Sequence, residues 1–286
     1  MRMSSTVRHL SAIRPFVTAA FLLSMVLGPA LTASAVVVQS RETRDINGNG
    51  YVDAVRMVTD AALNDNFAGF WTDVVGYTIV GYDTGPTAND NEFFVRMCEG
   101  VTPDTAATPG VQVVVGGSLG LPVDPAPVTS VDRAKPVLKT AWCVGTVGPN
   151  DPVFLKFSEA VSSNSALAND FGLPVIADSY GPGATVAGGQ NPIDPSVVMI
   201  TLGANPVLTP NGLYGPGAQT PGSPSGIYVF DGTRVMDAAA NAALNQTLGT
   251  AVDLGFGPLV PEPSTWALLL VGGAAVLVWR KARARS

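Results

Sequence analysis

The pattern most informative about architecture is DPVFLKFSEAV, residues 151–161, because it repeats that of DAVRMVTDAAL, residues 53–63. In both stretches apolar residues alternate with other residues, as expected of a strand with one buried face. The alignment, an offset of 98 residues, predicts three pairs of core positions: Val55 with Val153, Met57 with Leu155, and Leu63 with Val161. An offset near 100 residues is the size of a β-sandwich domain, so the chain predicts two modules of similar fold.

The chain between its two ends is typical of an all-β protein. Four further runs alternate in the same way and are bounded by Gly, Pro, Asp or Asn: GYTIVGY at 76–82, EFFVRMC at 92–98, PGVQVVVGG at 109–117 and PSVVMITLG at 195–203. No stretch of this body sustains a 3.6-residue apolar period. We place the junction in DRAKPVLKTAW, residues 132–142, where Pro136 can end one module. The predicted modules are residues 36–135 and 136–259.

The first 35 residues have the order of a secretory signal peptide. Arg2, Arg8 and Arg14 precede an apolar run, and Ala33-Ser34-Ala35 supplies the small residues of a cleavage site. We expect signal peptidase to cut after Ala35. The sequence therefore predicts an exported protein.

The charge and histidine content of residues 36–259 exclude several function classes. Nine basic and twenty-one acidic residues give this body a net charge near −12, which repels nucleic acid. The one histidine, His9, lies in the signal peptide. The body therefore lacks an imidazole for Ser-His-Asp, Cys-His or His-zinc chemistry. We expect a protein that is not an enzyme.

The stretch DINGNGYVD, residues 45–53, is a candidate calcium loop. Oxygen ligands recur at alternate positions, as calcium loops require: Asp45, Asn47, Asn49, the Tyr51 carbonyl and Asp53. The twelfth position holds Arg56 where a bidentate Glu is usual, so water or a neighbouring acid such as Glu42 would have to complete the site. The same residues also favour a metal-free turn, and the sequence leaves both interpretations open.

Cys98 and Cys143 are the two cysteines of the chain. An even pair in an exported protein predicts one disulfide. It would close 45 residues, contribute about 4 kcal/mol and join the two modules. The alternative is two separate buried thiols.

The chain ends in VPEPSTWALLLVGGAAVLVWRKARARS, residues 260–286. Residues from about 265 to 279 predict a transmembrane helix, with Trp266 and Trp279 at the two interfaces. The fourteen residues from Trp266 to Trp279 span about 21 Å, which is short for a bilayer core of about 30 Å. The basic cluster should stay cytoplasmic and leave the body outside: Arg280, Lys281, Arg283 and Arg285.

This tail resembles the PEP-CTERM sorting signal in all three of its parts: the tripeptide Pro261-Glu262-Pro263, the apolar helix and the basic end. The resemblance implies that the tail anchors the exported protein transiently in the inner membrane of a Gram-negative bacterium. An exosortase-type enzyme would then cut at the tripeptide and pass the protein to the cell surface or extracellular matrix. Extracellular polysaccharide is a further partner that the resemblance implies.

The body resembles tandem bacterial Ig-like modules of surface and S-layer-type proteins. The resemblance rests on ETRDINGNGYVDAVRMVTDAAL at 42–63, FLKFSEAV at 154–161 and VMDAAANAAL at 235–244, where Ala240 replaces the usual Gly. It implies two Ig-like β-sandwiches over roughly residues 38–258.

The leading functional hypothesis is a non-enzymatic surface or matrix protein of biofilms. The first alternative is a glycan-binding adhesin, for which Trp71, Tyr77 and Tyr82 are candidate platform residues. The second is a secreted glycoside hydrolase, which would need two acids facing each other across a cleft.

Overall fold

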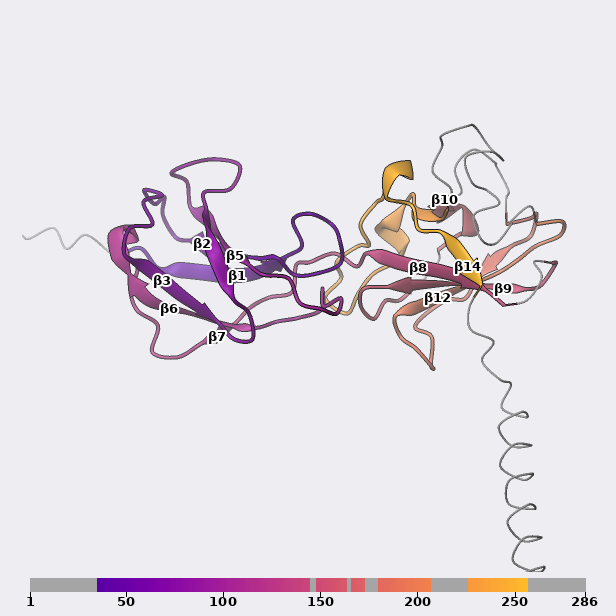
Figure 1. Cartoon of the computed structure of the whole chain (residues 1–286), viewed down its shortest axis with the longest axis horizontal. Helices are drawn as coiled ribbons and strands as arrows, with labels where there is room; N and C mark the ends of the chain where they lie inside the picture. Colours follow the sequence, from indigo (N-terminus) through magenta and orange to yellow (C-terminus); the bar gives the residue numbers. More distant parts are fainter. Residues whose placement is uncertain (1–34, 145–147, 164–165, 173–179, 207–225, 257–286) are drawn as a thin grey trace, which may run out of the picture.

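The computed structural model describes residues 35–144, 148–163, 166–172, 180–206 and 226–256. The predicted signal peptide and the sorting tail therefore lie outside the described residues. The described chain forms two lobes that follow one another along the long axis of the molecule (Figure 1). We call residues 35–135 the first lobe and residues 136–256 the second lobe.

The first lobe contains two antiparallel sheets. One has the order β1-β2-β5-β4 and the other the order β3-β6-β7. Their strands are β1 (Val38–Arg44), β2 (Ala54–Thr59), β3 (Phe70–Val74), β4 (Ile79–Asp83), β5 (Glu92–Met97), β6 (Gly110–Gly116) and β7 (Val128–Thr129), with the 3₁₀ turn η1 (Gly117–Leu119) after β6.

The two sheets of the first lobe face each other across one apolar core. Met57 of β2 and Phe93 of β5 lie in this core with Val113 of β6, and all three are fully buried. Phe70 of β3 meets Phe93 edge to face, with ring centroids 5.4 Å apart. The alternation of apolar residues thus places one face of each sheet inward.

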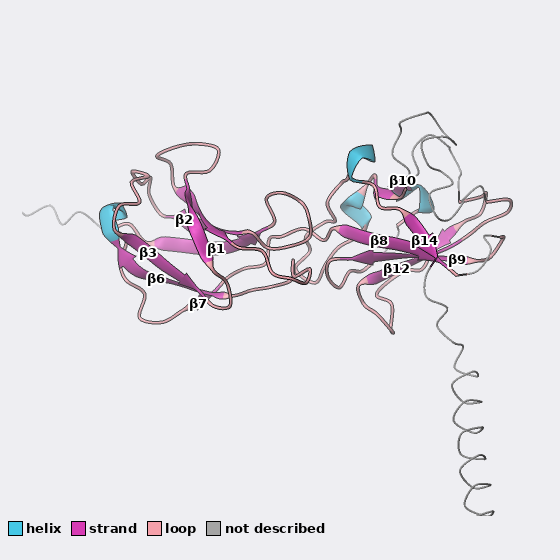
Figure 2. Cartoon of the chain, in the orientation of Figure 1, coloured by secondary structure: helices cyan, strands magenta, loops and turns pink. Residues whose placement is uncertain are grey.

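The second lobe contains a five-stranded sheet with the order β11-β12-β9-β8-β14 and a two-stranded sheet, β10-β13. The strands are β8 (Leu138–Cys143), β9 (Pro152–Phe157), β10 (Phe171–Gly172), β11 (Thr185–Val186), β12 (Val197–Thr201), β13 (Tyr228–Val229) and β14 (Leu254–Phe256). The 3₁₀ turns are η2 (Ala168–Asp170), η3 (Gly232–Arg234) and η4 (Leu248–Thr250). In the described residues every helical segment is a 3₁₀ turn (Figure 2), which confirms the all-β prediction.

The two lobes share one topology. The order β1-β2-β5-β4 of the first lobe corresponds to β8-β9-β12-β11 of the second, and the pair β3-β6 corresponds to β10-β13. The last segment of each lobe also returns to its first strand in parallel: Val131 pairs with Glu42 of β1, and β14 pairs with β8. The sequence repeat therefore reflects two similar folding units.

The core positions predicted from the repeat are confirmed. All six of these side chains are 5% exposed or less: Val55, Met57, Leu63, Val153, Leu155 and Val161. They belong to two separate apolar cores. Along the chain, Ala134 is the last residue of the first core and Leu138 is the first residue of the second. The junction between the lobes is therefore only a few residues long.

The predicted disulfide between Cys98 and Cys143 is absent, and both are free thiols. Cys98 is exposed just after β5, whereas Cys143 is buried in the second core. Strand β8 begins at the junction and carries Cys143 about 17 Å away from it, at about 3.3 Å per residue. A disulfide needs Cα atoms within about 7 Å, so the direction of β8 keeps the two cysteines apart.

Within the described residues, no helix is long and apolar enough to cross a bilayer. The predicted membrane segment at about 265–279 falls in residues 257–286, outside that part of the chain.

Truncation of Leu155 should destabilise the second lobe. Leu155 is fully buried, and replacing it by Ala should lower the free energy of unfolding by about 2–5 kcal/mol, measured by urea titration. The neighbouring Lys156 points outward and pairs with the exposed Asp194, so Lys156→Ala should cost about 1 kcal/mol or less. Equal losses in the two variants would contradict the assigned register of β9.

Candidate metal centre at the junction of the lobes

Buried hydrogen bonds join the two lobes. The hydroxyls of Thr105 in the first lobe and Ser158 in the second lie 2.6 Å apart, and both residues are buried. The Ser158 hydroxyl oxygen also accepts from the backbone N–H of Val137, at 3.0 Å. Ser158 thus holds the start of the second lobe against the loop between β5 and β6 of the first lobe.

The loop of residues 45–53 lies against the second lobe. The Lys139 ammonium donates to the Asn49 carbonyl and lies 4.6 Å from the centre of the Tyr51 ring. Gly50 has φ +89°, and a Cβ there would stand 2.8 Å from Lys139 Cδ and 3.1 Å from Ser158 Cβ. Glycine is therefore required at this position for both its backbone angle and its close approach.

Most oxygens of the candidate calcium loop close the turn itself. The Asp45 carboxylate accepts from the backbone N–H groups of Gly48, Asn49 and Gly50, and Asp53 accepts from Ile46. The side-chain oxygens of Asn47 and Asn49 each accept from the backbone N–H two residues ahead. This is the hydrogen bonding of an Asx-rich turn. Calcium binding by Asp45, Asn47, Asn49, Tyr51 and Asp53 stays a prediction.

Two acids from outside this loop hydrogen bond to it. Glu99 Oε1 accepts from the side-chain amides of Asn47 and Asn49, at 2.6 and 2.9 Å. Asp104 Oδ1 accepts from the backbone N–H of Val52 at 2.8 Å. Glu42, which we expected as the neighbouring acid, instead pairs with Arg44 and Arg56 at 2.5 and 3.0 Å. Glu42 lies beside these arginines because β1 and β2 place it directly opposite Arg56.

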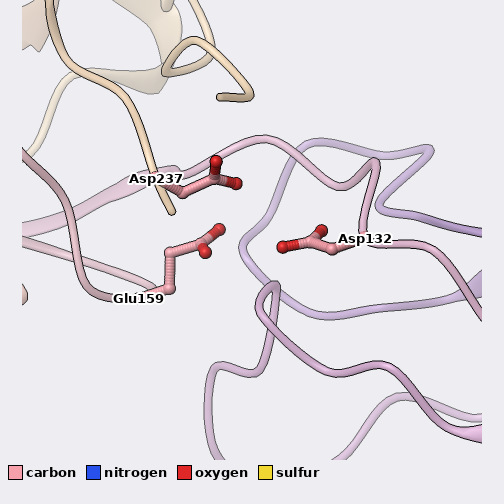
Figure 3. A group of neighbouring side chains, drawn as sticks. All are labelled: Asp132, Glu159 and Asp237. Carbon is pink, nitrogen blue, oxygen red and sulfur yellow. The ribbon is translucent and has the colours of Figure 1, made fainter. Parts of the chain in front are cut away.

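A second group of acids meets at the junction: Asp132, Glu159 and Asp237. One carboxylate oxygen from each lies within 4.8 Å of those of the other two. Figure 3 shows the three carboxylates pointing toward one another from three separate segments. No local sequence pattern indicates this site, because the three acids are distant from one another in the chain.

The three carboxylates differ in their partners. Both oxygens of Asp237 accept from Asn241, one from its backbone N–H and one from its side-chain amide, each at 2.7 Å. Glu159 is 7% exposed, and its Oε1 is buried without a hydrogen-bond partner. Among the described residues, no ion pair includes any of the three acids.

This environment disfavours the charged carboxylates. Burial raises the pKa of Glu159 from 4.5 to about 8; the Thr105 hydroxyl opposes the rise, and the charges of Asp132 and Asp237 add to it. Burial also raises the pKa of Asp132 to about 6, and the charge of Asp237 adds to this rise. The cluster therefore needs either protons or a cation to balance its charge.

The aromatic residues proposed for a glycan platform do not gather on one face. Trp71 is 56% exposed, but Tyr82 packs between Phe67 and Phe70, with ring centroids 5.4 and 4.9 Å away. The Tyr77 hydroxyl donates to Asp104 at 2.5 Å. Both tyrosines lie against the first core, so these three residues do not make a sugar-stacking surface.

The fold and the junction define an all-β protein of two matched lobes that is joined end to end through a buried, acid-rich contact. A family model described as the PEP-CTERM protein-sorting motif matches residues 259–284, so the chain carries this motif and the predicted sorting tail is confirmed. The motif implies export, membrane-anchored transit and processing by an exosortase-type enzyme. No curated protein and no solved structure matches the chain.

We expect the stability of the protein in EDTA to fall as pH rises from about 5 to about 8. The pKa of Glu159 is higher in the folded chain than its ordinary value, so the folded state holds more protons in this window, and rising pH favours unfolding. Urea titrations across this range measure the effect. Glu159→Gln should flatten the slope and the exposed Asp73→Asn should leave it unchanged; identical slopes in all three proteins would contradict the assignment.

Ala240→Gly should stabilise the loop that holds Asp237. Ala240 has φ +65°, a left-handed conformation that costs a residue with a Cβ about 1–2 kcal/mol. Glycine removes this strain and loses part of the gain as backbone entropy, so we expect a net stabilisation of about 0.5–1 kcal/mol in thermal unfolding. The adjacent Ala239 is outside the left-handed region, and Ala239→Gly should destabilise instead. A loss of stability in both variants, Ala240→Gly and Ala239→Gly, would count against the assigned loop conformation.

Proposed function

We propose that this chain is an exported, non-enzymatic protein of the cell surface or extracellular matrix, built from two Ig-like β-sandwich modules. The observation that carries the proposal is the sorting motif at residues 259–284. A tail of this kind directs a protein through the envelope, and a body of two folded lobes suits display outside the cell.

The topology of the lobes supports the Ig-like assignment. Each lobe places an antiparallel sheet of matching order over a second, smaller sheet, and each returns its last segment parallel to its first strand. Facing sheets across one core are the architecture of β-sandwiches. The stretches that resemble Ig-like modules, FLKFSEAV and VMDAAANAAL, form β9 with its following turn and the Asp237 loop.

The chemistry of the body supports a non-enzymatic role. Residues 36–259 contain no histidine, and two of the three clustered acids are less than 9% exposed, where a polysaccharide would not reach them. A glycoside hydrolase instead needs its two carboxylates on either side of a substrate cleft. The acidic body also disfavours nucleic acid as a partner.

The proposed route has three steps. Signal peptidase removes residues 1–35, the apolar tail holds the body on the outer side of the inner membrane, and an exosortase-type enzyme then cuts near Pro261-Glu262-Pro263. The released body would reach the surface or the matrix, where extracellular polysaccharide is the expected surrounding.

Glycan binding is the second candidate function, and one feature of the second lobe favours it. Trp142 of β8 and Phe154 of β9 stack with ring centroids 5.4 Å apart, and both are half-buried. Phe154 also lines a cavity of about 300 Å³ together with Gln190 and Asn191. Stacked rings beside amide groups are suited to the apolar face and hydroxyls of a sugar.

Intact mass spectrometry of the protein from its native host tests the proposed route. We expect a species that begins at Val36 and ends near Pro261–Pro263 in the medium or outer envelope, with any added mass reporting attachment to glycan or lipid. Replacing Pro261, Glu262 and Pro263 by Ala should retain a species ending at Ser286 in the membrane. Asp73→Asn, which removes an exposed charge on β3 of the first lobe, should be processed like the wild type.

A wild-type protein found only in membranes and still ending at Ser286 would contradict the proposal. The tail would then be a permanent anchor, and the body a tethered periplasmic protein.

A further inference from the structure

We propose that Asp132, Glu159 and Asp237 bind a divalent cation of the calcium class, and that this ion joins the two lobes. This site is separate from the loop of residues 45–53, and it does not depend on how the protein is sorted. Four features of the molecule support this site: the distances between the acids, the unpaired Glu159 oxygen, the chemistry of the ligands and the elements that hold them.

The distances fit one ion. Two oxygens bound to the same calcium ion at about 2.3–2.6 Å can stand as far as about 5 Å apart. The three carboxylate oxygens lie within 4.8 Å of one another, so a calcium ion between them needs little movement of the side chains. Magnesium forms shorter bonds, of about 2.0–2.1 Å. Two oxygens on opposite sides of a magnesium ion would therefore have to lie closer together than two oxygens on opposite sides of a calcium ion.

The buried oxygen of Glu159 points to a missing ligand. Glu159 is only 7% exposed, and its Oε1 has no hydrogen-bond partner. Its carboxylate faces those of Asp132 and Asp237 (Figure 3). An unsatisfied buried carboxylate oxygen is costly, and a folded protein rarely retains one without a water or an ion beside it. Because the carboxylates of Asp132 and Asp237 also face this site, a cation balances its charge better than a water molecule does.

The ligand set favours calcium over transition metals. All three side chains offer hard carboxylate oxygens, whereas zinc and copper sites are built mainly from His and Cys. The body has no histidine, and both cysteines lie elsewhere: Cys98 follows β5 and Cys143 ends β8. Calcium also accepts additional water ligands readily, which suits a site with only three protein side chains.

The ion would connect the lobes because its ligands are held by different ones. Asp132 follows Val131, whose backbone hydrogen bonds to β1 of the first lobe. Glu159 follows β9 of the second lobe, and Asp237 is fixed by Asn241 in a loop of that lobe. Asn241 already reaches across and donates to the Asp132 carbonyl at 3.3 Å.

The sequence repeat supports a role at the junction. In the alignment of residues 53–63 with 151–161, Glu159 of the second lobe corresponds to Ala61 of the first. The first lobe therefore has no acid at this position, and the fold that the two lobes share does not require one.

Calcium titration of the full-length chain in detergent tests the site. Protein stripped with EDTA is titrated with calcium chloride by calorimetry, and thermal unfolding is recorded with and without calcium. We expect the wild type to bind calcium and to unfold several degrees higher with it. Glu159→Gln should weaken the affinity at least about tenfold and lose the gain in unfolding temperature.

Three variants separate this site from its alternatives. Asp132→Asn, at a half-exposed position, repeats the test should Glu159→Gln fold poorly. Asp45→Asn removes a carboxylate from the loop of residues 45–53, and Asp73→Asn removes an exposed charge on β3; both should keep the calcium response. In EDTA at pH 8, Glu159→Gln should be at least as stable as the wild type, because it relieves the repulsion between the acids.

Protease cleavage reports on the junction itself. Arg133 is exposed beside Asp132, so trypsin cleavage after Arg133 should be slowed by calcium in the wild type and not in Glu159→Gln. The proposal is overturned if calcium up to about 10 mM leaves the wild type unchanged, or if Glu159→Gln and Asp132→Asn respond as the wild type does. Loss of the response in Asp45→Asn alone would assign the ion to the other loop and would equally overturn it.

Discussion

The Ser158 hydroxyl is the contact on which the junction depends. It lies 2.6 Å from the Thr105 hydroxyl of the first lobe and accepts from the Val137 backbone at the start of the second. Without it, the buried N–H of Val137 would lose its partner, at a cost of about 1–3 kcal/mol. The same residue immediately precedes Glu159, so the bond that joins the lobes also sets the position of the acid between them.

Around this contact, polar and electrostatic interactions replace the apolar interface that a single domain would use. The two apolar cores remain separate, and the lobes meet through hydroxyls, the Lys139 ammonium and clustered carboxylates. Such a junction can be strengthened or weakened by the surrounding solution, because charge interactions depend on ionic strength and ion binding depends on the concentration of the ion. For an exported protein, calcium outside the cell would then act as an assembly signal.

Local sequence patterns predicted the strands, the repeat and the tail, whereas contacts between distant segments escaped them. Val55 and Val153 were placed correctly because alternation depends only on neighbouring residues. No local sequence pattern indicates that β14 pairs with β8 in parallel. The disulfide prediction was wrong because the sequence did not give the direction of β8. The acid cluster forms only when three distant segments fold together, so no spacing in the sequence indicates it: Asp132, Glu159 and Asp237. The Asp45 loop was visible from its spacing, but its contact with Lys139 was not.

The parallel pairing of β14 with β8 has a mechanical consequence. Strand β8 begins at the junction and β14 runs beside it in the same direction, so the chain enters the second lobe at one end and leaves it at the other (Figure 1). A force that pulls the chain's two ends apart would slide these strands past one another. The backbone pairing from Leu254–Ala141 to Phe256–Cys143 would then have to break all at once. Shear of this kind resists force better than the sequential opening of a hairpin. Tension along the chain would therefore load β8 and β14 of the second lobe parallel to the strand axes.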